Sequence, residues 1–133
     1  MIYLDTSVAL AWLFAEDRVP ADGLWFRSLV SSRLIEYEIW VHANARGLAA
    51  SHGDSIRGLI DRLALVELTP TVLARAVEPF PAEVRTLDAL HLATCEFLRS
   101  RVRKLELATY DGRMMDAARG LGIQLHDPLK SSG

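Results

Sequence analysis

The chain has 133 residues, half of them hydrophobic, and its 15 Lys and Arg against 17 Asp and Glu give a formal net charge of −2 at pH 7. This size and apolar content predict a single domain whose core needs no disulfide bonds, and the slight excess of acid argues against a generally basic nucleic-acid-binding surface. No apolar run is long enough to span a membrane, and no basic, apolar leader precedes Asp5, so we expect a soluble cytoplasmic protein.

Short apolar runs typical of strands alternate with helical segments along the chain, without an internal repeat or a low-complexity stretch. Capping residues and the breakers glycine and proline set the expected boundaries. In chain order we expect a strand at 2–4, a helix at 8–14, a strand at 29–32, helices at 33–50 and 55–63, a strand at 65–68, a short helix from 69 that ends before Pro79, a helix at 86–101, a strand at 105–110, a helix at 112–119 and a strand at 123–125.

This alternation is typical of parallel strands joined by right-handed helical crossovers, which place helices on both faces of a sheet. We therefore predict a three-layer α/β/α sandwich with a central parallel sheet of four to five strands. The domain is expected to span residues 1–129, and residues 130–133 to form a flexible C-terminal tail.

Four acidic residues interrupt apolar stretches where a strand ends or a helix begins: Asp5, Glu38, Asp88 and Asp111. Ligands of parallel sheets bind beyond the carboxyl ends of the strands, where Asp5 and Asp111 are expected. Carboxylates gathered there repel one another unless a hard divalent cation lies among them. Each also has an ordinary structural interpretation, because Asp5 and Asp111 can cap helices and Asp88 can answer a helix dipole.

Glu38 is the most diagnostic of the four acids, because we expect it on the apolar face of its helix. The expected apolar stripe of that helix consists of Leu34, Val41, Ala45 and Leu48. Glu38 lies on this stripe, four residues after Leu34. A glutamate on a buried face needs a compensating partner, which favours Glu38 over Glu36 as a metal ligand.

Other reactive side chains are interpreted as structural. The four histidines and Cys95 lack the spacing of a zinc site, and Cys95 is expected in the core. The role of His91 is left open, because it lies one turn after Asp88. Asp116 is expected to form a surface ion pair with Arg113 or Arg119.

Four short motifs occur in a fixed order along nearly the whole chain. They are residues 2–7 (IYLDTS), Ser31 and Ser32 followed by Glu38, residues 87–93 (LDALHLA), and residues 108–114 (ATYDGRM) with the later pairs at 117–118 and 121–123. Together they resemble the PIN-domain family and, within it, the VapC-like ribonuclease toxins of bacterial type II toxin–antitoxin modules.

The resemblance implies an endoribonuclease that depends on Mg²⁺ or Mn²⁺ and hydrolyses RNA phosphodiester bonds with a metal-activated water. The acids that match the family's catalytic and metal-binding positions are Asp5, Glu38, Asp88 and Asp111. Asp5 and Asp88 match the positions most directly associated with metal, and whether one or two ions bind is left open.

Further roles and partners also come from the resemblance. Thr6 and Ser7 are expected to support the site, and Arg85 and Arg113 to contact phosphate. The implied partners are an RNA substrate, a cognate VapB-like antitoxin and a second copy of the chain in a homodimer.

Two other classes that place an aspartate after a strand do not match. A haloacid dehalogenase phosphatase needs a second aspartate where this chain has Ser7, and a receiver-like phosphoacceptor needs a later lysine, for which Lys104 and Lys130 are poorly placed. Two alternatives stay open. One is a PIN-like nuclease outside a toxin module that processes DNA or RNA, and the other is a catalytically silent binding module of the same fold.

Overall fold

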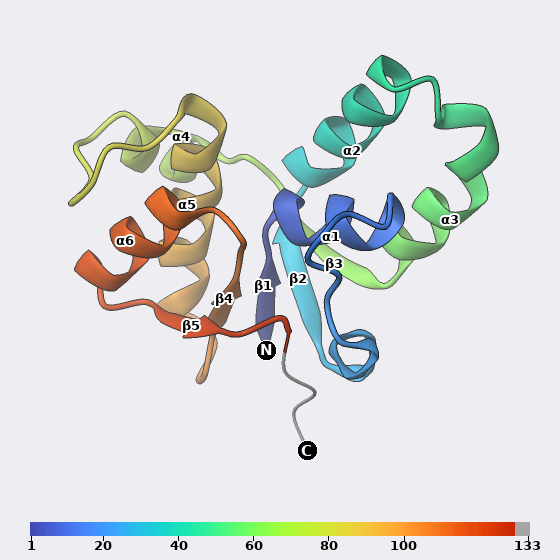
Figure 1. Ribbon diagram of the computed structural model, residues 1–133. Coiled ribbons are helices and arrows are strands. Elements are labelled where there is room, and N and C mark those ends of the chain that lie inside the picture. The colour runs from blue at the N-terminus through green and yellow to red at the C-terminus, as the bar shows by residue number, and fades with distance from the viewer. Residues whose placement is uncertain (130–133) are drawn as a thin grey trace.

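Five short strands form one parallel sheet in the order β3–β2–β1–β4–β5 in a computed structural model that describes residues 1–129 (Figure 1). The strands are β1 Ile2–Leu4, β2 Leu29–Ser32, β3 Leu63–Val66, β4 Glu106–Ala108 and β5 Gln124–His126. The central strand β1 pairs Tyr3 with Val30 on one side and with Leu107 on the other. The predicted tail at 130–133 lies outside the described residues.

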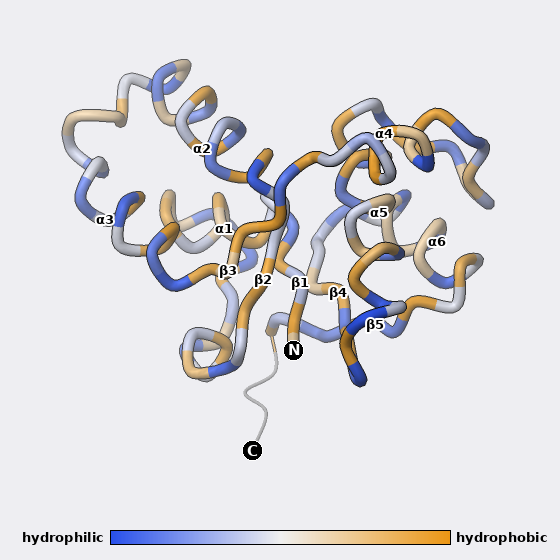
Figure 2. Tube along the Cα trace, turned by 180° about the vertical axis from the view of Figure 1, so that it is seen from behind, coloured by the Kyte–Doolittle hydropathy of each residue, from blue (hydrophilic) through white to orange (hydrophobic). Residues whose placement is uncertain are grey.

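Helices cover both faces of the sheet, so the predicted three-layer architecture is confirmed (Figure 1). The helices are α1 Thr6–Leu13, α2 Leu34–Ala45, α3 Ala49–Asp61, α4 Pro70–Ala76, α5 Thr86–Arg99 and α6 Gly112–Gly120, and a 3₁₀ turn, η1 Asp22–Phe26, precedes β2. The first three helices lie on one face, and α4, α5 and α6 lie on the other. Hydrophobic residues dominate the inner strands, whereas hydrophilic residues lie on the outer turns of the helices (Figure 2).

Alternate residues of β1 supply two separate cores. Ile2 and Leu4 pack with the helices of one face, and Tyr3 packs with α5 and α6 on the other. This alternation follows from the two-residue period of a strand. Cys95 lies in the second core as predicted, and burial raises the pKa of its thiol to about 12.

The segment from 33 to 63 differs from the prediction. The expected helix at 33–50 ends at Ala45, and the next begins at Ala49 rather than at residue 55. Gly47 adopts a φ of +68°, which favours glycine and ends a helix, whereas Gly53 is buried inside α3. Gly47 and Gly53 are both plausible helix-ending residues in the sequence, and only Gly47 lies at a helix end.

The apolar face expected on α2 is also wrong in part. Its buried residues are Leu34, Ile35, Glu38, Ile39 and Ala43. Of the expected stripe, Val41 and Ala45 are exposed and Leu48 lies beyond the end of α2, because the buried stripe follows Ile35 and Ile39. Glu38 lies on either stripe, so the inference that it is buried holds. The turn η1 was not predicted, and β3 begins two residues earlier than expected because Leu63 pairs with Leu29.

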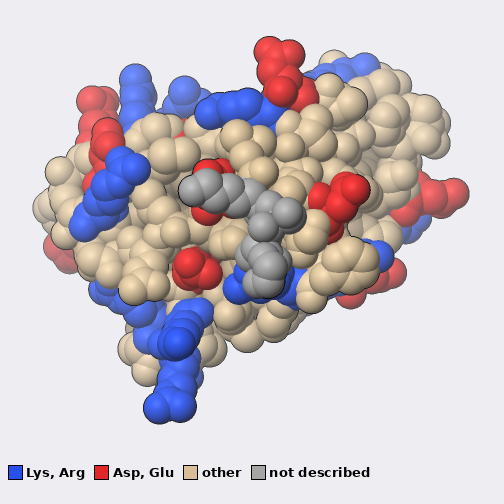
Figure 3. Space-filling model, turned by 60° about the horizontal axis from the view of Figure 1, so that its bottom comes forward, with Lys and Arg blue, Asp and Glu red and all other residues tan. Residues whose placement is uncertain are grey.

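Surface charges are mixed rather than segregated. The face turned toward the viewer in Figure 3 carries both basic and acidic side chains, with a basic group projecting at the lower left. Several exposed arginines have acidic partners, such as Arg33 with Glu67 at 2.8 Å and Arg46 with Glu16 at 3.1 Å. Such exposed pairs add little stability individually. Within residues 1–129, no helix is both long and apolar enough to cross a membrane.

The contact between the end of α6 and Pro81 gives a stability test. A Cβ at Gly120 would overlap the Pro81 ring, whereas a Cβ at Gly58 in α3 would meet no atom within 4 Å. We expect Gly120→Ala to lower the free energy of unfolding by about 1–3 kcal/mol through overpacking. The matched Gly58→Ala should raise it by about 0.5–1 kcal/mol. Urea denaturation measures both, and equal effects of the two variants would contradict the packing described here.

Candidate active site

Asp5 lies at the carboxyl end of β1, where the chain leaves the sheet for α1. Its backbone N–H donates to the carbonyl of Ala108 at 3.0 Å, so β1 and β4 stay paired up to the edge of the sheet. Its side chain caps α1, and the residue is only 3% exposed. A carboxylate at this depth needs hydrogen-bond donors to remain charged.

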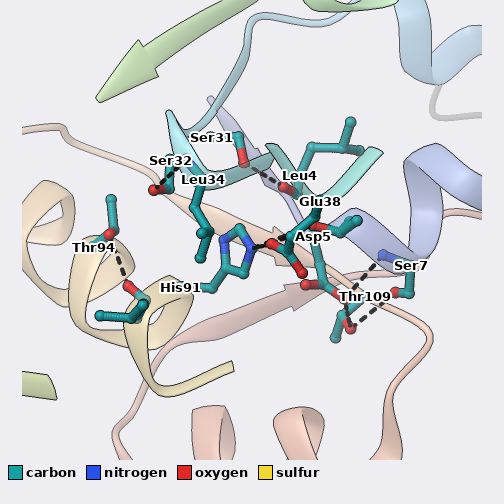
Figure 4. Close-up of polar contacts among 12 residues, drawn as sticks. Leu4, Asp5, Ser7, Ser31, Ser32, Leu34, Glu38, His91, Thr94 and Thr109 are labelled. Carbon is teal, nitrogen blue, oxygen red and sulfur yellow. Dashed lines mark hydrogen bonds and ion pairs between the residues drawn. The ribbon is translucent and has the colours of Figure 1, made fainter. Parts of the chain in front are cut away.

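Three donors converge on a single oxygen of Asp5 (Figure 4). Ser7 donates to Oδ2 through its backbone N–H at 3.3 Å and its hydroxyl at 2.6 Å, and the hydroxyl of Thr109 donates at 2.8 Å. No residue in the range 1–129 donates a hydrogen bond to Oδ1. The hydrogen bonds therefore fix the carboxylate through one oxygen and leave the other for a ligand.

Thr109 joins Asp5 to Asp111. Its hydroxyl donates to Asp5 and accepts the backbone N–H of Asp111 at 3.0 Å. The Oδ1 atom of Asp111 caps α6 by accepting the backbone N–H groups of Arg113 at 2.9 Å and Met114 at 3.2 Å. Asp111 therefore caps α6, as foreseen, and is also linked to Asp5 through Thr109.

Glu38 enters the site from α2 and is 9% exposed. Its Oε1 atom accepts the hydroxyl of Thr6 at 2.9 Å and lies 2.6 Å from Nε2 of His91. His91 comes from α5 on the opposite face of the sheet and is fully buried. Burial lowers the pKa of His91, but the hydrogen bond to Glu38 and the charges of Asp5, Glu38 and Asp88 outweigh it, so the net shift is upward.

Asp88 lies in the first turn of α5 and is half-buried. Its carboxylate makes no hydrogen bond or ion pair with the described part of the chain, residues 1–129. Burial and then the charges of Asp5 and Asp111 raise its pKa to about 6, with a smaller contribution from Glu38 and an opposing one from His91. Asp88 is thus close enough to the other three acids foreseen in the sequence to be repelled by each of them.

The donor set fits a hard divalent cation that keeps much of its water. Among residues 1–129, no three His, Cys, Asp or Glu side chains form a ready cage for a metal ion. Mg²⁺ ordinarily takes only one or two protein carboxylates and retains several waters. Asp5 Oδ1 and the carboxylate of Asp88 are free to provide such ligands, and positive charge between them would relieve the repulsion that raises the pKa of Asp88.

The arginines named in the sequence lie at helix starts beside the acids. Arg85 immediately precedes α5, and Arg113 lies in the first turn of α6. Both are exposed, and neither forms an ion pair with another described residue. Asp116 pairs with Arg119 at 3.4 Å, as predicted for a surface charge.

A groove of about 590 Å³ opens beside the acids, and Ser7, Asp111, Asp17 and Arg18 are among its lining residues. Arg18 is held there, because one of its Nη atoms donates to the carbonyl of Tyr110 at 3.2 Å. The groove gives an extended ligand room to reach the acidic cluster from one side.

The sequence did not reveal three polar features of this site: Thr109, the contact of His91 with Glu38, and Tyr3, whose hydroxyl lies 2.7 Å from Nδ1 of His91. Tyr3 and Thr109 lie in segments interpreted as strands, where side chains are expected to pack rather than to bind. His91 carried a detectable sign, its position one turn after Asp88, but the contact with Glu38 depends on the packing of α5 near α2.

Comparisons with known proteins identify the family of the chain. The PIN domain model matches residues 2–120. Ribonuclease VapC46 of Mycobacterium tuberculosis is 35% identical over 130 residues, and ribonuclease VapC35 of the same species is 32% identical over 134; each match covers 96% of this chain and 97% of the relative. A toxin–antitoxin complex from Klebsiella pneumoniae shares the fold, with a TM-score of 0.65, 18% identity, and coverage of 96% of this chain and 98% of the other. The chain belongs to the PIN domain family.

Proposed function

We propose that this protein is a divalent-metal-dependent endoribonuclease of the VapC type and the toxin of a toxin–antitoxin module. The observation that carries the proposal is the gathering of acids around Asp88, whose pKa is raised by burial and then by the charges of Asp5, Asp111 and Glu38. Similarity to ribonucleases named VapC along 96% of the chain supports the same activity.

The four acids have different roles in the proposed hydrolysis. A bound Mg²⁺ or Mn²⁺ supplies positive charge that polarises the scissile phosphate and makes a water molecule more acidic. Asp5 and Asp88 would hold the ion most directly. Glu38 and Asp111 each have one oxygen occupied by hydrogen bonds, and the other oxygen would complete the metal site, either by binding the ion directly or by holding one of its waters.

The substrate and the partners follow from charge and from the relatives. Arg85 and Arg113 contact phosphates of the RNA beside the acids, where a bidentate guanidinium suits them. A VapB-like antitoxin is the cognate partner, in keeping with the toxin–antitoxin complex that shares the fold. The homodimer and the cytoplasmic location stay predictions.

Removing the Asp5 charge tests the reaction. We expect Asp5→Asn to lower the rate of Mn²⁺-dependent RNA cleavage by about 100-fold or more, because a metal ligand contributes several kcal/mol to the transition state. A labelled single-stranded RNA and sequencing of the ends measure this. The control is Asp116→Asn, which removes an exposed carboxylate on α6 and should cleave at the wild-type rate.

Two outcomes of that assay contradict the proposal. Wild-type cleavage that survives excess chelator would exclude the metal-dependent mechanism. Intact RNA with the wild-type protein in Mn²⁺ would favour a silent binding module, and cleavage of DNA at the same rate would remove the preference for RNA.

The pKa of Asp88 predicts how stability depends on pH. In the metal-free folded protein this pKa is about 6, above the ordinary 3.8, so folding favours the protonated form. Stability contributed by Asp88 is complete below pH 3.8 and is lost as the pH rises through about 6. Asp88→Asn removes this loss, so in chelator its Tm should exceed that of the wild type at pH 8, with a difference that shrinks toward pH 4. A variant less stable than the wild type at pH 8 would contradict this.

A further inference from the structure

A chain of hydrogen bonds runs from the backbone of β2 through the core to Glu38. The backbone N–H of Ser32 donates to the hydroxyl of Tyr3 at 3.2 Å. That hydroxyl lies 2.7 Å from Nδ1 of His91, whose Nε2 lies 2.6 Å from Oε1 of Glu38. Tyr3 and His91 are both fully buried. These hydrogen bonds therefore connect α5 on one face of the sheet to α2 on the other, and neither the Tyr3 ring nor the His91 ring contacts solvent.

The contact with Glu38 has a defined direction. An ionised carboxylate can only accept hydrogen bonds, so Nε2 of His91 is protonated and donates the hydrogen bond to Oε1 of Glu38. The hydroxyl of Thr6 donates to the same oxygen. Both donors therefore occupy Oε1, and no described residue between 1 and 129 donates to Oε2.

Two contacts fix the imidazole itself. Its ring stands edge-on to Tyr3, with centroids 5.8 Å apart and planes at 78°. The hydrogen bond at Nδ1 prevents rotation about the Cβ–Cγ bond. Figure 4 shows the Glu38 carboxylate between this ring and Asp5. The terminal torsion of a glutamate is otherwise broad, so these contacts select one orientation of its two oxygens.

Stability alone does not require this arrangement. A buried charged or polar pair is often matched or exceeded in stability by apolar side chains of the same volume. We propose that His91 and Tyr3 are positioning residues that set the orientation of Glu38 for the metal site. This proposal rests on the proposed function. In it, Glu38 acts on the metal site through Oε2, and Tyr3 of the central strand β1 fixes the Glu38 carboxylate through His91.

Two substitutions of His91 separate positioning from packing. His91→Gln places an amide N–H₂ near the position of Nε2 and keeps a donor for Glu38. His91→Asn is shorter and reaches only the Nδ1 side, toward Tyr3. Both remove the same ring from the core, so both should lose similar stability in chelator.

Calorimetric titration with Mn²⁺ measures the Kd of each variant for the ion. We expect His91→Asn to raise the Kd for Mn²⁺ by about 10–100-fold, the usual cost of losing a partner of a metal ligand, and His91→Gln to stay within a few-fold of the wild type. Equal Kd values for the wild type and His91→Asn would overturn the positioning role. A wild type that binds no Mn²⁺ would instead overturn the proposed function, so the two failures are distinguishable.

Substitution of two tyrosines tests the hydrogen-bond chain even if a His91 variant fails to fold. Tyr3→Phe removes the hydroxyl that joins Ser32 to His91. Tyr110→Phe removes a buried hydroxyl that has no hydrogen-bond partner among the described residues. We expect Tyr3→Phe to weaken Mn²⁺ binding by up to about 10-fold and Tyr110→Phe to leave it unchanged. Equal Mn²⁺ affinities of the two variants would overturn the inference.

Discussion

The gathering of carboxylates at one edge of a parallel sheet determines how this site is built. Parallel strands must end at the same edge, so Asp5 and Asp111 meet there, while α2 and α5 bring Glu38 and Asp88 to it. Three of the four acids are fixed by hydrogen bonds to one oxygen only. Asp88 has no such bond, and its pKa is raised first by burial and then by the charges of Asp5 and Asp111.

The hydrogen bonds that organise the acids come from the core rather than from surface loops. Thr109 follows β4 and bridges Asp5 to Asp111, and Tyr3 lies in the middle strand. Residues that secure the sheet therefore also orient the site. This coupling explains how a site of buried and half-buried carboxylates can stay ordered in a chain of 133 residues.

Much of the architecture could be predicted from the sequence, because strand and helix periods alternate clearly and an aspartate follows the first strand. Glu38 was found for a sound reason, a charge on an apolar helix face, although the stripe itself ran through Ile39 rather than Val41. The boundary at Gly47 was missed because Gly53 offers an equally strong local break. The contact of His91 with Glu38 could not be predicted, because it joins residues 53 positions apart on helices of opposite faces.

We propose that Asp5 and Asp88 hold a divalent cation at the carboxyl edge of the sheet. Anomalous diffraction from a crystal soaked in Mn²⁺ tests it most directly. We expect a peak for one or two ions in contact with Asp5 Oδ1 and the carboxylate of Asp88, and no such peak in crystals of Asp5→Asn. An anomalous peak bound elsewhere, or the same peak in both crystals, would contradict it.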